Sequence, residues 1–317
     1  MKKATIWIIA ACIMMIAGLC LCAVAIGSYN QNFSSLESSQ FETNAYSFTQ
    51  GFSNISVQTD TAEVIFVPSS NGFTQVVCYE EPNLKHTVLI ENDTLCIRTV
   101  SKKNWLDYIG IHFDTPKITI SIPEGHHGSL SILTRTGSIS IPKDFHFENI
   151  TINGNTGHVS IGASVTDTLS VQISTADIHV ENISAGNLSL KTSTGKIHVS
   201  EANCQGDIGI HVSTGKAELF DVTCQNFITT GNTGSLTMHG VFASQQFSIE
   251  RSTGNVIFKD CDASNIVIET DTGRVSGNFL TPKVFITKTD TGNVTVPESK
   301  TGGRCEITTD TGNIHIK

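Results

Sequence analysis

The dipeptide Thr-Gly recurs along this chain at a nearly constant spacing, and this limits the possible folds more than any other feature. Successive copies are 19 or 20 residues apart, and Thr175-Ala176 occupies the one place where the glycine is missing. A fixed period of this length is typical of a stacked array in which each repeat is one structural unit. The glycines are Gly137, Gly157, Gly195, Gly215, Gly234, Gly254, Gly273, Gly292 and Gly312.

Apolar residues keep fixed positions around each glycine. The positions seven and five residues before it, and the position two residues after it, are almost all apolar, while Ser, Asn, Asp, His and Lys lie between them. This alternation has a period of two, which predicts two short half-buried β-strands that meet at a Thr-Gly corner. The column seven residues before the glycine contains Leu130, Ile150, Leu169, Leu188, Ile208, Phe227, Phe247, Ile266, Phe285 and Cys305.

The repeats predict an all-β fold over residues 126–317, a right-handed parallel β-solenoid of about ten coils of 19–20 residues. Coils stack at the strand spacing of about 4.8 Å, so the array forms a rod with a continuous aliphatic core. Right-handed coiling follows from the preference of parallel crossovers. A further apolar position seven residues after the glycine predicts either a second corner or a third short side in the coil. Glycine suits the Thr-Gly corner because it adopts positive φ without a Cβ penalty.

Residues 1–28 differ in kind from the repeats. Two lysines precede an uncharged stretch from Ala4 to Gly27, which is long enough as a helix to cross a bilayer core of about 30 Å. Because the next lysine is Lys85, we expect a single-pass protein of the cell membrane with a cytoplasmic N-terminus and extracytoplasmic repeats. The alternative is a signal peptide that is cleaved near Ala25.

Two segments of different character lie between this anchor and the repeats. Residues 29–52 are rich in Ser, Asn and Gln and low in charge, which predicts a flexible juxtamembrane linker. Residues 53–125 alternate as β-strands do but lack the period, so we expect an irregular β cap over the first coil. Solenoids need such a cap because an open end exposes unpaired backbone groups.

The order of these pieces resembles the bacterial "putative adhesin" β-solenoid family, a domain of unknown function that is often held by an N-terminal membrane anchor. The resemblance rests on the early coil at residues 61–64 (Thr-Ala-Glu-Val), the strand that ends at Pro123, and the run of Ser/Asp-Thr-Gly corners. It covers residues 53–317. The resemblance implies a β-solenoid in the cell envelope and supplies no catalytic residues.

The chain carries 20 basic and 29 acidic residues, a net charge of −9, which argues against nucleic acid as a partner. Its nine cysteines do not make a disulfide framework. Three lie in the apolar N-terminal segment, and Cys261 and Cys305 fall in inward columns. Two disulfides are geometrically possible, Cys204 to Cys224 across consecutive coils and Cys78 to Cys96 in the cap.

Three Asp-Thr-Gly triplets, at Asp271, Asp290 and Asp310, have the sequence of the aspartic-protease signature. That chemistry needs two such loops that face each other and share one proton between carboxylates. Here the triplets recur one coil apart and replace the Ser-Thr-Gly and Asn-Thr-Gly of earlier repeats, so we interpret them as corners. Stacked carboxylates about 5 Å apart repel one another. A bound calcium ion is therefore one hypothesis for this ladder, and plain solvation is the other.

His179, His198 and Glu218 form a second outward ladder, three residues after the corner on successive coils. These residue types can ligate zinc, although the coil spacing is long for a shared ion and solvated side chains are the simpler interpretation. A third ladder, four residues before the glycine, is similar to the charged groove of carbohydrate lyases built on β-helices. Short, uninterrupted coils leave little to wall a pocket there. This third ladder contains Lys191, His211, Thr230, Glu250, Glu269 and Lys288.

These observations favour a non-catalytic, membrane-anchored surface protein whose adhesin-like rod binds a cell-wall polymer or a surface protein, or acts in envelope-stress sensing. A glycan-active β-helix enzyme, of the lyase or hydrolase kind, is the alternative, and a structural spacer is a third possibility. No cofactor is expected beyond the calcium hypothesis. The sequence stops at Lys317 directly after the last corner, so we expect end-to-end association through the C-terminal coil, with Ile314 and Ile316 partly uncovered.

Overall fold

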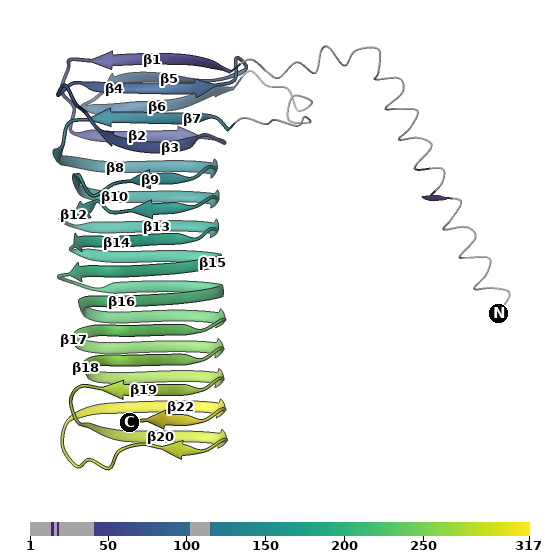
Figure 1. Ribbon diagram of the computed structural model, residues 1–317, viewed down its shortest axis with the longest axis vertical. Helices are drawn as coiled ribbons and strands as arrows, with labels where there is room; N and C mark the ends of the chain where they lie inside the picture. The colour runs from purple at the N-terminus through teal and green to yellow at the C-terminus, as the bar shows by residue number, and fades with distance from the viewer. Residues whose placement is uncertain (1–13, 16–17, 19–40, 102–114) are drawn as a thin grey trace.

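The computed structural model describes residues 14–15, 18, 41–101 and 115–317, and residues 41–101 and 115–317 are mostly β-strand. They form a tall stack of flat coils with an irregular N-terminal end (Figure 1). The strands of that end and of the first coils are β1 (Glu42–Phe48), β2 (Asn54–Thr59), β3 (Glu63–Pro68), β4 (Thr74–Glu80), β5 (Leu84–Glu91), β6 (Thr94–Ser101), β7 (Lys117–Ile122), β8 (Gly125–Thr136), β9 (Ile139–Ile141), β10 (Phe145–Thr156), β11 (Val159–Ile161) and β12 (Ser164–Val165). The remaining strands are β13 (Thr168–Thr175), β14 (Ile178–Ala185), β15 (Asn187–Cys204), β16 (Ile208–Thr233), β17 (Leu236–Thr253), β18 (Val256–Thr272), β19 (Val275–Phe279), β20 (Lys283–Thr291), β21 (Val294–Thr295), β22 (Gly303–Thr311) and β23 (Ile314–Ile316).

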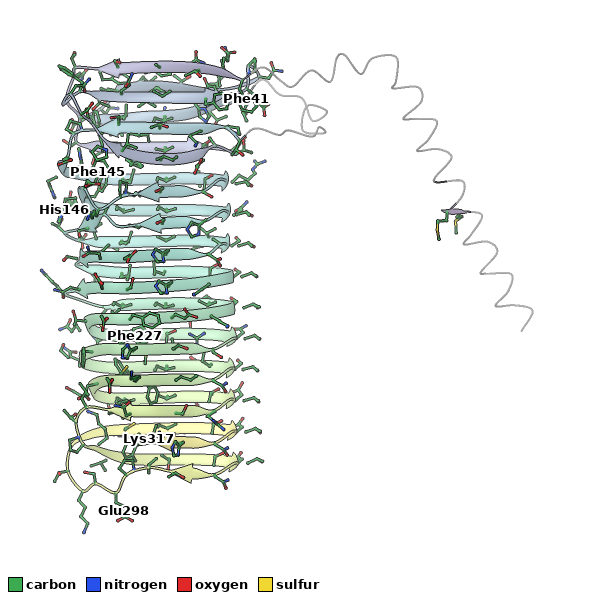
Figure 2. The ribbon with its side chains drawn as sticks, viewed as in Figure 1. Phe41, Phe145, His146, Phe227, Glu298 and Lys317 are labelled. Carbon is green, nitrogen blue, oxygen red and sulfur yellow. The ribbon has the colours of Figure 1, made fainter. Side chains whose placement is uncertain are left out.

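Each coil of the regular region lies in register on the next, with parallel pairing between equivalent strands. Ile150 of β10 pairs with Leu130 of β8 on one side and with Leu169 of β13 on the other. The second strands of these coils, β9, β11 and β14, stack in the same way. A continuous apolar core fills the coils, and Phe227 belongs to it (Figure 2). The ring of Phe227 meets that of Phe247 edge to face. The predicted β-solenoid of about ten coils is confirmed.

The Thr-Gly corners select glycine for a reason that the sequence predicts only in part. Gly215 has a φ of 140°, a conformation that residues with a Cβ rarely adopt. Gly273 lacks this positive φ, yet a Cβ at either position would collide with backbone of the neighbouring coil. The carbonyl oxygen of Gly195 stands in the way at Gly215, and that of Gly254 at Gly273. Close approach of stacked backbones therefore requires glycine even where φ does not.

A second corner lies six residues after the first, where the chain turns in the left-handed region of backbone conformation. Asn182, Glu201, Asp221 and Asp260 have φ between 51° and 54°, and Gly240 has a φ of 62°. Asn and Asp tolerate this region better than most residues that carry a Cβ. The apolar column that follows this corner is buried at Ile183, Ala202, Val222, Val241 and Cys261 and exposed at Leu280. The second corner, one of the two alternatives for this column, is present in the structure.

The N-terminal end is closed by strands that stack out of chain order. β2 lies between β8 of the regular array and β6, and β3 lies between β9 and β7. The antiparallel strands then extend the two sheets, with β4 on β7, β1 on β4 and β5 on β6. The described part of the predicted 53–125 segment thus forms an irregular β cap. The cap also includes β1, inside the predicted 29–52 linker, because full pairing with β4 holds this strand in the sheet.

The C-terminal coil is inserted between two earlier coils. β22 lies between β18 and β20, and β23 lies between β19 and β21 (Figure 1). Ile314 pairs with Val275 on one side and Val294 on the other, and both Ile314 and Ile316 are buried. The expectation that this coil is the open end is therefore wrong. The open end is formed by β20 and β21, which precede the last coil in the sequence.

The predicted membrane anchor falls on residues 1–28, of which only 14–15 and 18 belong to the described part of the chain. Within the described residues, no helix is both long enough and apolar enough to span a bilayer. The anchor and the orientation stay predictions from the sequence.

Candidate functional site

His179 and His198 occupy equivalent positions on neighbouring coils, where β14 pairs with β15. Their imidazole rings stack with centroids 4.9 Å apart and an angle of 3° between the ring planes. Glu218 takes the same position on the next coil. Its Oε2 lies 3.7 Å from Nδ1 of His198 and 2.7 Å from Nζ of Lys196. In-register stacking of the coils therefore places the predicted second ladder in one row.

The row of rings continues beyond the residues that the sequence singled out. The ring centroid of Phe220 lies 5.4 Å from that of His198, and that of His239 lies 6.4 Å from Phe220. Together with His179 they form a stripe across four consecutive coils, which we call the ring stripe. Sequence reasoning missed Phe220 and His239 because they stand five residues after their glycines, one outward position beyond the column that contains His179 and His198.

Shallow grooves lie beside the His179 end of the ring stripe. They bring carboxylate and ammonium groups next to ring faces, which is a mixture that recognises polar ligands. One groove of about 260 Å³ is lined by His158, Asp177, Ile178, His179, Lys196 and His198. A second groove of about 420 Å³ includes His179, Glu181, Asn182 and Glu201 in its lining.

Neighbouring groups set the charge of the ring stripe. Burial, with further contributions from His179 and Lys196, holds the pKa of His198 below its usual value. This imidazole is therefore neutral at neutral pH. A hydrogen bond from Lys196 lowers the pKa of Glu218, which stays ionised. The stripe combines a neutral imidazole with a carboxylate and ammonium pair, so it offers both donors and acceptors.

Neither predicted metal ladder gathers its ligand atoms into a compact set. His179 pairs with Glu181 at 3.1 Å instead of sharing a site with His198 and Glu218. In the part of the chain that the structure describes, three such ligand atoms come within 4.8 Å of one another in one place, and that place is in the cap. The aspartates Asp271, Asp290 and Asp310 are exposed. Because the last coils stack out of order, Asp310 lies between the other two.

The charged ladder that resembles a lyase groove is also rearranged at its end. Glu250 pairs with Glu269 on the neighbouring coil, but Thr308 lies between Glu269 and Lys288. His211, further along the row, bonds to Thr230 at 2.7 Å and to Ser213 at 3.1 Å. His211 is thus within hydrogen-bond distance of one residue on its own strand segment, Ser213, and of one on the next coil, Thr230.

The cysteines of the described residues are free and buried, so neither possible disulfide, Cys204 to Cys224 or Cys78 to Cys96, is formed. Burial raises the pKa of the Cys204 and Cys224 thiols to about 12. These thiols stay protonated and act as small apolar core residues.

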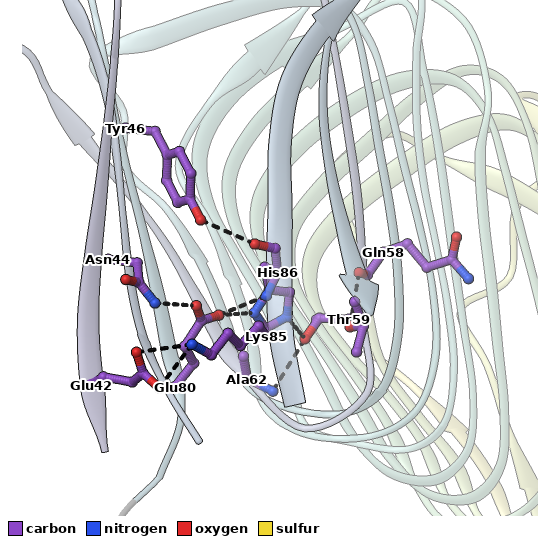
Figure 3. A network of polar contacts seen from close by, with 10 residues as sticks. Glu42, Asn44, Tyr46, Gln58, Thr59, Ala62, Glu80, Lys85 and His86 are labelled. Atoms are coloured by element: carbon purple, nitrogen blue, oxygen red, sulfur yellow. Dashed lines mark hydrogen bonds and ion pairs between the residues drawn. The ribbon is translucent and has the colours of Figure 1, made fainter. Parts of the chain in front are cut away.

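A cluster of buried polar side chains lies inside the cap, where sequence reasoning predicted no site (Figure 3). Glu80 and His86 have exposed fractions of 0% and 3%. Oε2 of Glu80 lies 2.7 Å from Nδ1 of His86 and accepts a hydrogen bond from its backbone N–H at 2.8 Å. Nδ2 of Asn44 donates to Oε1 of Glu80 at 2.8 Å. Burial opposes the ionisation of Glu80, but the bonds from His86 and Asn44 outweigh it and keep its pKa below the ordinary value.

Thr59 completes this cluster in an order that resembles a nucleophile, base and acid triad. Its Oγ1 lies 3.0 Å from Nε2 of His86, whose other ring nitrogen bonds to Glu80. Thr59 is only 3% exposed, and no substrate reaches a hydroxyl at that depth without opening the cap. One sequence signal could have revealed the cluster, since Val76, Cys78 and Glu80 alternate inward along β4 and a glutamate is rare in a core column.

Parallel in-register coils with glycine corners, an irregular β cap and outward ladders define a β-solenoid repeat protein that presents flat rows of side chains. The chain belongs to the Toastrack DUF4097 family, whose sequence profile matches residues 52–215. No curated protein matches the chain. The family membership confirms the resemblance that the sequence indicated.

Solved structures of bacterial proteins are similar to this chain at low sequence identity. A protein described as a putative adhesin from Parabacteroides distasonis is 14% identical, with 88% of this chain and 99% of that chain covered and a TM-score of 0.50. A putative adhesin from Parabacteroides merdae is 12% identical, with 87% and 96% covered and a TM-score of 0.48. A putative lipid binding protein from Parabacteroides distasonis is 16% identical, with 87% and 97% covered and a TM-score of 0.46.

Proposed function

We propose that the chain is a non-catalytic, membrane-anchored surface protein whose rod binds a cell-wall polysaccharide through the ring stripe. The observation that carries the proposal is the stack of His179, His198, Phe220 and His239 on successive coils. Sugar units present C–H faces that pack on rings, and hydroxyls that bond to imidazole, carboxylate and ammonium groups. Four coils span about 14 Å, so the stripe suits an extended polymer better than a small molecule.

The uncharged stretch from Ala4 to Gly27 supports the location that this function needs. As a single-pass anchor with a cytoplasmic N-terminus, it would hold the rod outside the membrane, where cell-wall polymers are. A rod that joins the wall to the membrane also has the arrangement that an envelope-stress sensor requires. The description of the Parabacteroides distasonis relative as a putative adhesin is in keeping with a binding role.

Retention on isolated cell wall tests the proposal. The wild-type full chain is expected to co-sediment with cell-wall polysaccharide, and His198→Ala with Phe220→Ala is expected to lose at least tenfold in affinity. Phe242→Ala is the matched control, since this ring is 37% exposed on a different part of the surface and its loss should change nothing.

The same experiment separates the alternatives. Equal retention of the double variant and the wild type would contradict binding through the ring stripe. Because the proposed anchor alone would hold the full chain on phospholipid vesicles, only retention on vesicles that the double variant loses would point to a lipid ligand of the ring stripe. Release of soluble sugar fragments would support the glycan-active enzyme, and retention on neither material would leave a structural spacer.

A further inference from the structure

Three side chains with different ligand atoms meet inside the cap, between its two sheets. Cys78 and Glu80 project inward from β4, and His86 projects inward from β5. The sulfur, a carboxylate oxygen and a ring nitrogen all lie within 4.8 Å of one another, and all three residues are buried. Figure 3 shows Glu80 and His86 directed toward each other at this place.

We propose that Cys78, Glu80 and His86 hold a zinc ion. Thiolate, imidazole and carboxylate ligands at about 2.0 to 2.3 Å are the set that zinc takes in proteins. Ligand atoms around such an ion stand about 3.3 to 3.7 Å apart. The 2.7 Å separation of Nδ1 of His86 and Oε2 of Glu80 therefore has to widen by no more than about 1 Å.

The charge balance of the cluster favours a divalent cation. As thiolate and carboxylate, Cys78 and Glu80 carry two negative charges, which one zinc ion neutralises inside an apolar core. In the metal-free protein, burial and the charge of Glu80 raise the pKa of Cys78 to about 12, so its thiol is protonated. Zinc binding releases this proton to solvent and leaves His86 as the tautomer that is protonated on Nε2.

Groups around the three ligands are placed to orient them. With Nδ1 on the metal, Nε2–H of His86 donates to Oγ1 of Thr59, which is 3.0 Å away. Asn44 holds Oε1 of Glu80 at 2.8 Å and leaves Oε2 toward the other ligands. Outer hydrogen bonds of this kind fix the tautomer and the carboxylate in protein metal sites. An ion here would join β4 and β5 across the core, and β1 through Asn44.

Cobalt, which replaces zinc and absorbs light, provides the test. The metal-free full chain is titrated with Co²⁺, and one equivalent is expected to give a thiolate-to-cobalt charge-transfer band that excess Zn²⁺ removes. Cys78→Ser is expected to lose this band, and His86→Gln to weaken Co²⁺ binding by about tenfold or more. Cys204→Ser removes another buried thiol outside the cluster and is expected to retain the band.

Absence of the band in the wild type, or its persistence in Cys78→Ser, would overturn the proposal. Circular dichroism shows whether each variant folds. If Cys78→Ser does not fold, the test of the zinc site rests on the wild type alone. Zinc X-ray absorption of the chain after dialysis must then show one sulfur among the ligands. No retained zinc, or zinc without a sulfur ligand, would leave the cluster as a hydrogen-bonded network only.

Discussion

Nζ of Lys283 lies 2.5 Å from Oδ1 of Asp262, although a third coil lies between the coils of these two residues. Lys283 is on β20 and Asp262 is on β18, and the inserted strand β22 lies between them. Gly303 of β22 stands opposite Lys283 and has no side chain to fill the space. Lys283 also donates to the carbonyl of Ala263 at 2.8 Å and to Thr281 at 2.7 Å. The Lys283 side chain therefore links β20 to β18 across the inserted coil.

Removal of this ion pair should destabilise the C-terminal coils. Lys283→Met leaves Asp262 without its partner at a site where both side chains are mostly buried, with exposed fractions of 3% and 14%. Breaking such a pair costs about 3 kcal/mol or more. Lys288→Met on the same strand is the control, because its pair with Asp290 is exposed and should contribute less than about 1 kcal/mol. Urea unfolding of both variants measures the difference in stability. Equal midpoints would contradict a stabilising role of the ion pair between Lys283 and Asp262.

Glycine at the first corner should be irreplaceable even by alanine. In Gly215→Ala the new Cβ meets the carbonyl oxygen of Gly195 and the positive φ is strained, so we expect a loss of about 2 kcal/mol or more. Lys216→Ala, one residue further on and exposed, should change the free energy of unfolding by less than about 0.5 kcal/mol. Thermal melts of the two variants provide the comparison. Coincident melting curves would contradict the register of the corner.

The sequence predicted the regular coils because their period and their inward columns are local properties of each repeat. Stacking order is not local. Nothing near Ile314 indicates that its coil lies between those of Val275 and Val294, since the same corner sequence suits any place in the array. For the same reason the sequence did not predict that Asp310 lies between Asp271 and Asp290, or that Thr308 lies between Glu269 and Lys288.

The candidate sites were predictable to different degrees. His179 and His198 lie one period apart, and their stacking follows from in-register coils. The contact of His198 with Phe220 joins two different columns, which a search along one column does not find. The cluster of Glu80 and His86 depends on two cap strands that have no repeat to align, so only the inward position of the glutamate indicated it.

Acid should weaken the cap through Glu80. Its pKa in the folded protein lies below the ordinary value of 4.5, so its ionised form stabilises the fold above about pH 4.5. This contribution is lost as the pH falls through the lower pKa of the folded state. In the metal-free protein, Glu80→Gln should therefore be less stable than the wild type at pH 7, and the difference should shrink as the pH falls toward 3. Melts across this range test it, with exposed Glu250→Gln as the control. A difference that is constant with pH would contradict the role of the ionised carboxylate.

The open end formed by β20 and β21 should mediate self-association. These strands pair with β22 and β23 on one side only, and Val294, at an inward position of the coil formed by β20 and β21, is 42% exposed. At the other end of the described rod the outermost strands β1 and β5 are antiparallel to their neighbours, so this end does not repeat the parallel coil geometry of β20 and β21 and is a poor match for head-to-tail stacking. Two open ends related by a two-fold axis would cover each other and close the assembly as a dimer.

Sedimentation of the full chain at tens of micromolar is the measurement for this last prediction. The wild type is expected to dimerise, and Val294→Lys is expected to be monomeric because a charge at the exposed end of the core opposes its burial. Phe73→Lys places the same charge on an exposed residue of the cap, at the opposite end of the rod, and should not affect dimerisation. A monomeric wild type would leave the edge of β20 free for a strand of a different protein. Dissociation by Phe73→Lys but not by Val294→Lys would instead place the contact at the cap.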